Sequence, residues 1–475
     1  MTLIQCFVDG APTDFAEGPT FTWTSPNEAV DAIVMVDATD AGVDQAVASA
    51  TRSFEANRWV STSHRIAWIK SVADRIEQRA EEIAALICAD VGKPRRSANF
   101  EVGRGVEFAR STAAVLQGLG TETPALDTVA NGAGRLGMVR RVPYGTVAVV
   151  TPFNAPVNLL LQKVIPALAA GNAVVAKPHP AGTRVALLLA QCCVEAGLPA
   201  GLFNVVTGDR HPAQALARHP GVRVVSFTGG VAAGEALVAA AGAKKFVAEL
   251  GSNSANVVLS DADLQDAAAR IASAGFEASG QQCVSAQRVI VESSVYDPFL
   301  AHFVEAARRL KVGPADESQV DVGPMISLGA ANRVMDVARA SVAAGARYAL
   351  EPTQNGCIVS PGILVDAPLS SPIWTDELFG PMVVVQRAED AEHALQLAND
   401  SPFGLQGAVF TRSLKQAFHF SERLDVGAIW INEASRFRLD MYPFGGSKQS
   451  GFGREGVRYA IEEMSQLKFI GIRPL

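Results

Sequence analysis

The stretch Thr146-Val147-Ala148-Val149-Val150 is a continuous apolar run, which predicts a strand buried on both faces of a sheet. Helical and apolar-strand patterns alternate after it, with helices at 159–170, 183–196 and 214–218 and strands at 173–176, 203–206 and 222–227. This alternation is typical of βαβ units in a parallel, doubly wound sheet. Because such sheets bind ligands beyond the carboxyl ends of their strands, we expect a functional site at that edge.

The same alternation resumes after Gly251 and predicts a second α/β unit. Its expected elements are helices at 264–274, 296–310 and 391–398 and buried strands at 256–259, 289–291, 382–385 and 427–432. Earlier in the chain, short apolar runs such as 33–36 predict strands. Periodic apolar residues then predict helices at 63–91 and 99–118, and Gly92-Lys93-Pro94 ends the first of them.

The composition is that of an ordinary globular protein. The 475 residues are 48% hydrophobic and 19% charged, and this length predicts two or three domains. The net charge of −7 argues against nucleic acid as a partner, since phosphate binding needs a basic face. No apolar run has the length of a transmembrane span, and we expect no signal peptide. The six cysteines form no metal-binding cluster, so we expect no metal site and a reducing, cytoplasmic location.

Two residues of the chain have flanking sequences that point to chemistry. Small and polar residues lead into Cys283 and an apolar strand follows it, so the thiol can be presented at a ligand site. Glu249 ends the apolar run Phe246-Val247-Ala248, where a carboxylate is costly unless it is solvated, paired or functional. A thiol nucleophile and a carboxylate base are together sufficient to form and then hydrolyse a thioester. A buried structural cysteine is the alternative.

Polar residues also follow several strands of the first predicted sheet. Thr228-Gly229-Gly230 ends one strand and opens a helix, which predicts an anion site or simply a tight turn. Lys177 ends another strand of the same sheet and points into the same crevice, or is a solvated lysine. Asn154 is either a donor to a developing oxyanion or a turn asparagine.

Two further groups come from the second unit. Glu377 is a candidate for binding ribose hydroxyls, with Phe379 shaping a ring pocket, although a turn carboxylate is the alternative. Arg436 and Arg438 precede a glycine-rich loop at 443–456, and their guanidinium groups suit a carboxylate, phosphonate or sulfonate. A solvated loop is the alternative.

The order of these motifs is more specific than any one of them. Phe153-Asn154, Lys177-Pro178, Thr228-Gly229, Glu249-Leu250-Gly251, Gly280-Gln281-Gln282-Cys283, Glu377-Leu378-Phe379-Gly380-Pro381 and Pro443-Phe444-Gly445-Gly446 resemble the aldehyde dehydrogenase superfamily over nearly the whole chain. The resemblance implies an α/β fold with a Rossmann-type parallel-sheet cofactor domain, an α/β catalytic domain and a small oligomerisation arm. It implies a cofactor domain at 1–120 and 144–248, a catalytic domain at 249–461 and an arm at 121–143 and 462–475. Homodimers or homotetramers are the implied assemblies.

The resemblance also implies a role for each matched residue. Cys283 is similar to the family's nucleophile, Glu249 to its general base for deacylation, and Asn154 to its oxyanion donor. The bound cofactor is expected to be NAD(P). The implied contact residues for it are Thr151, Pro152, Phe153, Lys177, Pro178, His179, Gly208, Phe227, Thr228, Gly229, Gly230, Leu250, Gly251, Glu377 and Phe379.

Two features of this sequence refine the resemblance. Members that prefer NAD often carry an acidic residue three positions after the motif lysine, and Pro180 stands there, so we expect NADP to be tolerated or preferred. The stretch 152–158 and the segment around Met441-Tyr442-Pro443-Phe444 are similar to the branch that oxidises lactaldehyde, glyceraldehyde and phosphonoacetaldehyde. This implies a small polar or anionic aldehyde, with candidate contacts at Arg436, Arg438, Arg104 and Asn158.

Alternative activities remain open at this point. A member that transfers its acyl group to coenzyme A typically lacks the glutamate found at Glu249, so its presence favours hydrolysis. A non-catalytic structural relative predicts a lost nucleophile or base, whereas both are present. A simple thiol hydrolase needs a histidine partner, and only His179 lies near the motifs.

Overall fold

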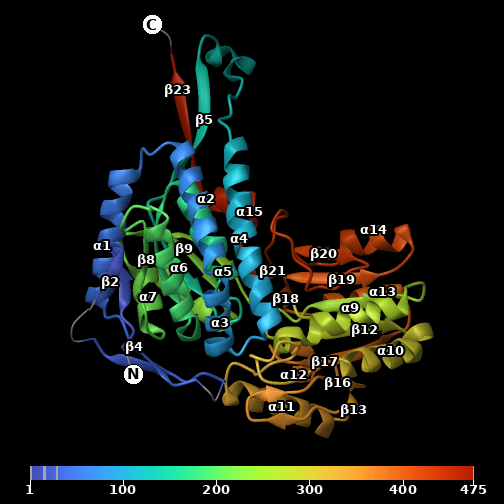
Figure 1. The fold of residues 1–475 in the computed structure, drawn as a ribbon. Coiled ribbons are helices and arrows are strands. Elements are labelled where there is room, and N and C mark those ends of the chain that lie inside the picture. The colour runs from blue at the N-terminus through green and yellow to red at the C-terminus, as the bar shows by residue number, and fades with distance from the viewer. Residues whose placement is uncertain (1–2, 14–17, 28–29, 474–475) are drawn as a thin grey trace.

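Two open sheets and a projecting hairpin form the architecture of the computed structural model, which describes residues 3–13, 18–27 and 30–473 (Figure 1). The prediction about a signal peptide rests partly on Met1 and Thr2, which lie outside the described residues. Among the described helices, none is both long enough and apolar enough to cross a bilayer.

The first sheet confirms the predicted doubly wound topology. Its order is β2-β1-β8-β7-β6-β9-β10-β22, and its five central strands are parallel. They are β6 (Thr146–Thr151), β7 (Ala173–Pro178), β8 (Phe203–Val205), β9 (Val222–Thr228) and β10 (Lys245–Glu249). Antiparallel strands complete its edges, namely β1 (Cys6–Val8), β2 (Ala11–Thr13) and β22 (Gly451–Phe452). From β6 the chain adds β7 and β8 on one side and then β9 and β10 on the other. The topological switch point, where such sheets bind ligands, therefore lies between β6 and β9.

Helices cover this sheet because their apolar faces need a partner surface. They are α1 (Asp40–Asn57), α2 (Thr62–Gln78), α3 (Ala80–Val91), α4 (Arg95–Gly118), α5 (Asn158–Ala170), α6 (Thr183–Glu195), α7 (His211–Arg218) and α8 (Val231–Ala241). All thirteen residues of α5 are buried, which explains its almost continuous apolar sequence.

The prediction of one helix at 63–91 was wrong. The chain leaves helical geometry at Arg79, with φ −106° and ψ 17°, so α2 ends there and α3 begins. Neither proline nor glycine marks the break. Arg79 instead makes a local ion pair with Glu82 at 2.9 Å and a tertiary one with Glu195 on α6 at 3.3 Å. Gly92 ends α3 with φ 75°, as its sequence predicted.

The second sheet has the order β13-β16-β17-β12-β11-β19-β20, and all its strands except β13 run parallel. They are β11 (Ala255–Val258), β12 (Arg288–Glu292), β13 (Arg347–Leu350), β16 (Gly362–Val365), β17 (Met382–Ala388), β19 (Gln406–Phe410) and β20 (Ala428–Ile431). Strand β20 was predicted to be buried, but its four residues are half-buried because it lies at the sheet edge. Packed around the sheet are α9 (Leu264–Phe276), α10 (Tyr296–Arg308), α11 (Leu328–Ala343), α12 (Pro372–Thr375), α13 (Ala391–Asn399) and α14 (Leu414–Arg423).

A long antiparallel pair joins β5 (Leu136–Pro143) to β23 (Ser465–Ile472), which follows α15 (Val457–Glu463). Figure 1 shows this pair extending away from both sheets. Four short strands form two small ribbons, β3 (Thr20–Trp23) with β4 (Ile33–Val36) and β14 (Gln354–Asn355) with β15 (Ile358–Val359). Strand β18 (Phe403–Gly404) pairs with β21 (Ser447–Lys448) near the glycine-rich loop.

Candidate active site

The carboxyl ends of β6, β9 and β10 lie at one edge of the first sheet. Thr228 is the parallel partner of Glu249, and the Gly229 N–H donates to the Glu249 carbonyl at 3.0 Å. Thr151 ends β6, and the segment with Asn154 leaves from it. The topology therefore gathers the predicted switch-point residues at the expected edge.

The segment before Cys283 has an unusual backbone. Ala278, Ser279 and Gly280 follow α9 with φ of 53°, 60° and 63°, a left-handed conformation that side chains disfavour. Tertiary bonds hold it, because the Ser279 hydroxyl donates to the Gly323 carbonyl at 2.8 Å and Gln281 Oε1 accepts from the Ile326 N–H at 2.9 Å. At Gly280 a Cβ would lie 2.3 Å from the Gly380 carbonyl oxygen, so the chain approach requires glycine there.

This backbone leaves Cys283 half-buried, against a small apolar cluster of Val284, Leu405 and Phe444. Its backbone N–H makes no hydrogen bond within the described part of the chain. Burial, followed by the nearby carboxylate of Glu249, raises the pKa of the Cys283 thiol to about 12. The resting sulfur therefore carries its proton near neutral pH.

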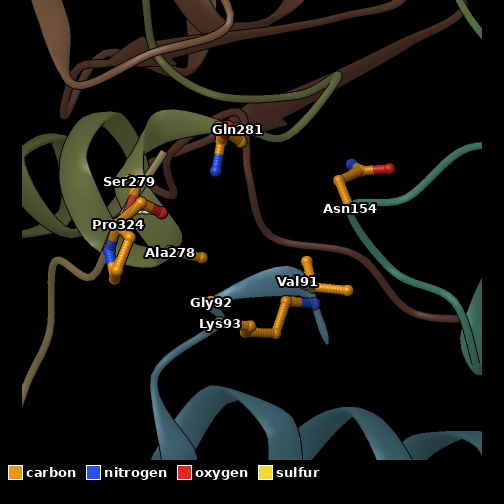
Figure 2. A pocket seen from close by; sticks show the side chains of 8 residues that line it. All are labelled: Val91, Gly92, Lys93, Asn154, Ala278, Ser279, Gln281 and Pro324. Atoms are coloured by element: carbon orange, nitrogen blue, oxygen red, sulfur yellow. Dashed lines mark hydrogen bonds between the residues drawn. The ribbon is translucent and has the colours of Figure 1, made fainter. Parts of the chain in front are cut away.

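Asn154 faces the segment that leads to Cys283. It lines a small pocket together with Lys93, Ala278, Ser279 and other residues, and Figure 2 shows Asn154 on one side of that pocket with Ala278 and Ser279 on the other. Asn154 is buried, and its side-chain amide makes no hydrogen bond to any described residue. A buried amide without a partner is available to a ligand.

Glu249 is buried, and neither carboxylate oxygen has a hydrogen-bond partner among the described residues. Burial and the neighbouring negative charge of Glu455 raise the pKa of Glu249 to about 8. A carboxyl with such a pKa can hold or release a proton near neutral pH, as a general base must.

Glu455 belongs to a buried ionic cluster that the sequence did not predict. It forms an ion pair with Lys163 of α5, and its Oε2 accepts from Arg438 Nη2 at 2.9 Å. Burial opposes ionisation of Glu455, but Lys163 and Arg438 outweigh it and lower the pKa of that carboxyl. The adjacent polar residues Gln162 and Lys163, inside the largely apolar run 159–170, were the available sign of this cluster.

A row of aromatic rings lies at the carboxyl ends of β6 and β7. The His179 ring centroid is 5.2 Å from that of Trp23 and 5.3 Å from that of Phe153, and Phe153 is 5.8 Å from Phe379. Burial and then the charge of Lys177 lower the pKa of His179 to about 3, so the imidazole is neutral. The structure thus brings three of the predicted cofactor contacts together.

Several groups at this edge fit a bound dinucleotide. The Lys177 ammonium group makes no hydrogen bond to any described residue, and the side chain is buried. Burial lowers its pKa to about 8, although the charges of Asp209 and Asp37 oppose that shift. The Thr228 hydroxyl is buried without a partner, and Gly230 opens the eleven-residue helix α8. Orphaned polar groups and free helix N–H groups favour a phosphate-bearing ligand.

Glu377 approaches the backbone just after β10. Its Oε1 accepts from the Ser252 N–H at 2.9 Å, and a Cβ at Gly251 would lie 2.5 Å from its Oε2. Burial raises the pKa of Glu377 to about 7. The remaining predicted contacts at strand ends or beside them are Pro152, Pro178, Gly208, Phe227, Gly229 and Leu250.

The candidate substrate residues divide into two groups. Arg104 binds Asp440 through two bonds, Nε to Oδ2 at 3.0 Å and Nη2 to Oδ1 at 2.6 Å. Gln162 connects this pair to Arg438, because its Nε2 donates to Asp440 at 2.9 Å and its Oε1 accepts from Arg438 at 3.1 Å. Asn158 lies one helical turn before Gln162, and its buried Oδ1 has no hydrogen-bond partner in the described chain.

Arg436 is not part of that network. Its Nη2 donates to Glu277 Oε2 at 2.8 Å, and Arg96 contacts the same carboxylate at 3.4 Å. Arg438 stacks over the Phe444 ring at 3.6 Å, and its buried Nε has no partner among the described residues. The residues missed by the sequence analysis are Lys163, Gln162, Asp440 and Glu455.

Comparison with known proteins settles the family. The profile of the aldehyde dehydrogenase family matches residues 15–470. The chain belongs to this family. It is 36% identical to 3-sulfolactaldehyde dehydrogenase of Priestia megaterium, over 91% of each chain. It is 34% identical to lactaldehyde dehydrogenase of Methanococcus aeolicus, over 85% of this chain and 86% of that one.

Solved aldehyde dehydrogenases share the fold. NADP-dependent glyceraldehyde-3-phosphate dehydrogenase from Bacillus halodurans, complexed with NADP, superposes with a TM-score of 0.97 at 31% identity over 100% of both chains. An NAD-dependent aldehyde dehydrogenase from Sinorhizobium meliloti gives 0.95 at 32% identity, over 99% of this chain and 95% of that one. The predicted fold class and the prediction of an NAD(P)-dependent aldehyde dehydrogenase are confirmed.

Proposed function

We propose that this aldehyde dehydrogenase oxidises a small polar or anionic aldehyde to its carboxylic acid through a thioester on Cys283. The observation that supports this most directly is that both carboxylate oxygens of the buried Glu249 lack a partner among the described residues, while its charge acts on the Cys283 thiol. Asn154 faces the same segment with a free side-chain amide. Nucleophile, base and oxyanion donor are the three groups that acyl chemistry needs.

The first half-reaction forms the thioester. The Cys283 thiol gives its proton to solvent water and the thiolate sulfur attacks the aldehyde carbon, while Asn154 with the Cys283 backbone N–H stabilises the resulting oxyanion. NAD(P), held by Lys177, the Thr228-Gly229-Gly230 turn and Glu377, supplies the hydride acceptor when bound. Loss of the aldehyde hydrogen as hydride leaves the acyl group on Cys283.

The second half-reaction is hydrolysis. Glu249 accepts a proton from water, the oxygen attacks the thioester carbon, and the carbon–sulfur bond breaks to release the acid. Glu455 remains ionised through Lys163 and Arg438, so its negative charge keeps the Glu249 pKa high. Burial raises the Glu249 pKa most and the charge of Glu455 adds to it, whereas Arg438 and Lys163 lower it; the balance makes Glu249 a stronger base than an ordinary carboxylate.

The substrate class follows from charge near the reacting sulfur. Arg104 and Arg438 lie in one polar network with Gln162 and Asp440, and the buried Nε of Arg438 has no hydrogen-bond partner among the described residues. Relatives named for sulfolactaldehyde and lactaldehyde support a short substrate. We therefore assign anion contacts to Arg104 and Arg438, which share this network, and keep Arg436 as a weaker candidate because it lies outside the network.

Cofactor choice is proposed from one position. Pro180 is buried and begins a short 3-10 turn, so no carboxylate stands three residues after Lys177 to repel a 2′-phosphate. NADP is then tolerated or preferred. A panel of short aldehydes, neutral and anionic, assayed with NAD and with NADP tests substrate class and cofactor choice together. Turnover confined to long apolar aldehydes would contradict the proposal.

The domain division and assembly are also proposed. The hairpin of β5 and β23 exposes Leu136, Leu467, Phe469 and Ile472, and such an apolar surface on a projecting arm suits a second copy of the chain. We assign this hairpin to the oligomerisation arm of a homodimer or homotetramer, which mass photometry distinguishes from a monomer. A cytoplasmic location remains a prediction.

A further inference from the structure

A second cavity lies away from the candidate active site. It has a volume of about 200 Å³, and three parts of the chain line it: the connection from α1 to α2, the end of β5, and the end of α5. Its lining includes Arg58, Arg65, Arg140 and Arg141 and no acidic residue. We call it the arginine cavity. None of its lining residues belongs to the candidate active site.

The positive charge of the arginine cavity is poorly compensated. Among the described residues, neither Arg65 nor Arg140 forms an ion pair with a carboxylate. Arg58 is paired with Glu55 at 2.8 Å, and Arg141 is 3.9 Å from Glu462. In the β5–β23 ladder Arg140 lies directly opposite Lys468, a like-charge pair that is unfavourable unless an anion is near.

Two nitrogens of the Arg65 guanidinium are hydrogen-bonded, and its third nitrogen is not. Its Nη1 donates to the Ala169 carbonyl at 2.7 Å and its Nη2 to the Thr62 hydroxyl at 3.0 Å, which fixes the guanidinium plane. Its Nε is buried without a partner in the described chain. Burial and then the charge of Arg140 lower the pKa of Arg65, which is the expected sign of an uncompensated cation.

The cavity also meets the start of a long helix. Ser61 caps the seventeen-residue helix α2, and Ser61 and Thr62 both line the cavity. The positive end of the helix dipole therefore adds to the field of four guanidinium groups. Such groups bind tetrahedral oxyanions through paired N–H donors.

We propose that the arginine cavity binds a small dianion of the phosphate or phosphomonoester class, at a site separate from the catalytic one. Its volume is smaller than that of pockets for drug-sized ligands, which begin at about 300 Å³, so the organic part is limited to a few carbons. Trp59 is 79% exposed at the cavity and offers a ring face to that part.

The active site and the arginine cavity are related through α5. Asn158 and Gln162 lie near its start, and Ala170 at its end lines the cavity. Thirteen residues at ~1.5 Å each make this helix about 20 Å long, so one anion cannot occupy both sites. Binding at the cavity is thus measurable without catalysis.

Calorimetric titration of the NADP-saturated enzyme with inorganic phosphate and with glycerol 3-phosphate, at constant ionic strength in chloride buffer, tests the site, because the cofactor then occupies the phosphate contacts at Lys177 and Thr228. We expect saturable binding of one ion per chain and a rise in Tm with phosphate. Arg140→Gln is suited to the test because Arg140 is exposed and unpaired, and it should weaken binding about tenfold. Arg65→Lys keeps the charge but removes Nε, and should also weaken binding.

Two controls separate this site from other charges. Arg308→Gln removes an equal charge from the exposed face of α10 and should leave phosphate binding unchanged. Arg104→Gln alters the candidate active site and should also leave it unchanged. Non-saturable binding, equal binding to Arg140→Gln and the unaltered protein, or loss of binding in Arg104→Gln alone would each overturn the proposal.

Discussion

Lys163 and Glu455, separated by 292 positions in the sequence, form a fully buried ion pair beside Glu249. The pair joins α5, which packs on the first sheet, to the loop that precedes α15. Its consequence is electrostatic, because it keeps Glu455 ionised. Burial raises the pKa of Glu249, and the charge of Glu455 raises it further.

The pH dependence of hydrolysis follows from that relationship. The pKa of Glu249 is about 8. At lower pH its carboxyl is protonated and cannot accept a proton from water, and at higher pH the carboxylate is available. The deacylation rate should therefore rise with pH and level off above about 8, whereas an ordinary carboxylate would have levelled off near 5. A pH profile of single-turnover acid release measures this. A rate independent of pH between 6 and 9 would contradict the assignment of Glu249.

Removal of Lys163 should destabilise the fold. Lys163→Met leaves Glu455 buried with only Arg438 as a cationic partner, and breaking a buried ion pair costs about 3–5 kcal/mol. Urea unfolding monitored by circular dichroism measures the free energy of unfolding. Arg339→Gln, which removes the exposed pair with Asp336, should cost only about 0–1 kcal/mol. Equal decreases in the free energy of unfolding of the two variants would show that the buried ion pair stabilises the fold no more than the exposed one.

Arg104 should discriminate anionic from neutral aldehydes. Arg104→Gln should raise KM for a sulfonated or carboxylated aldehyde about tenfold and change KM for a neutral one much less, since a charged hydrogen bond is worth about 1.5–3 kcal/mol. Arg436→Gln is the matched comparison, because Arg436 is also paired with a carboxylate, Glu277, but lies outside the network of Arg104. If Arg436→Gln has the larger effect on anionic substrates, the assignment of the two arginines is reversed.

Cofactor choice should respond to one substitution. Pro180→Glu places a carboxylate three residues after Lys177, where it would repel a 2′-phosphate. The ratio of kcat/KM for NADP to that for NAD should fall at least about tenfold, which corresponds to about 1.4 kcal/mol. A strong preference for NAD in the unaltered protein would refute the role given to Pro180.

The sequence predicted the features that depend on local pattern. Apolar runs such as 146–150 identified the parallel strands, and the run 246–248 identified the strand whose carboxyl end carries Glu249. The break at Arg79 was not predictable, because neither proline nor glycine marks it and one of the ion pairs of Arg79 is to the distant Glu195. The exposure of β20 depended on its place at a sheet edge, which periodicity does not encode.

The ionic part of the site was less predictable for the same reason. Glu455 contacts Lys163 and Arg438 only in the folded chain, and the sequence around these three residues does not predict the contact. Arg104 and Asp440 likewise come from segments far apart in the chain. The adjacent Gln162 and Lys163 in a largely apolar helix were a visible anomaly, but their partners were not.

The most direct test of the account is a rapid-mixing measurement of reduced cofactor formed by Glu249→Gln and by Cys283→Ala with a substrate aldehyde. Glu249→Gln should form about one reduced cofactor per active site in a burst and then turn over very slowly, because the thioester accumulates. Cys283→Ala should give neither burst nor turnover. Steady turnover in Cys283→Ala, or full turnover without a burst in Glu249→Gln, would contradict the proposed mechanism.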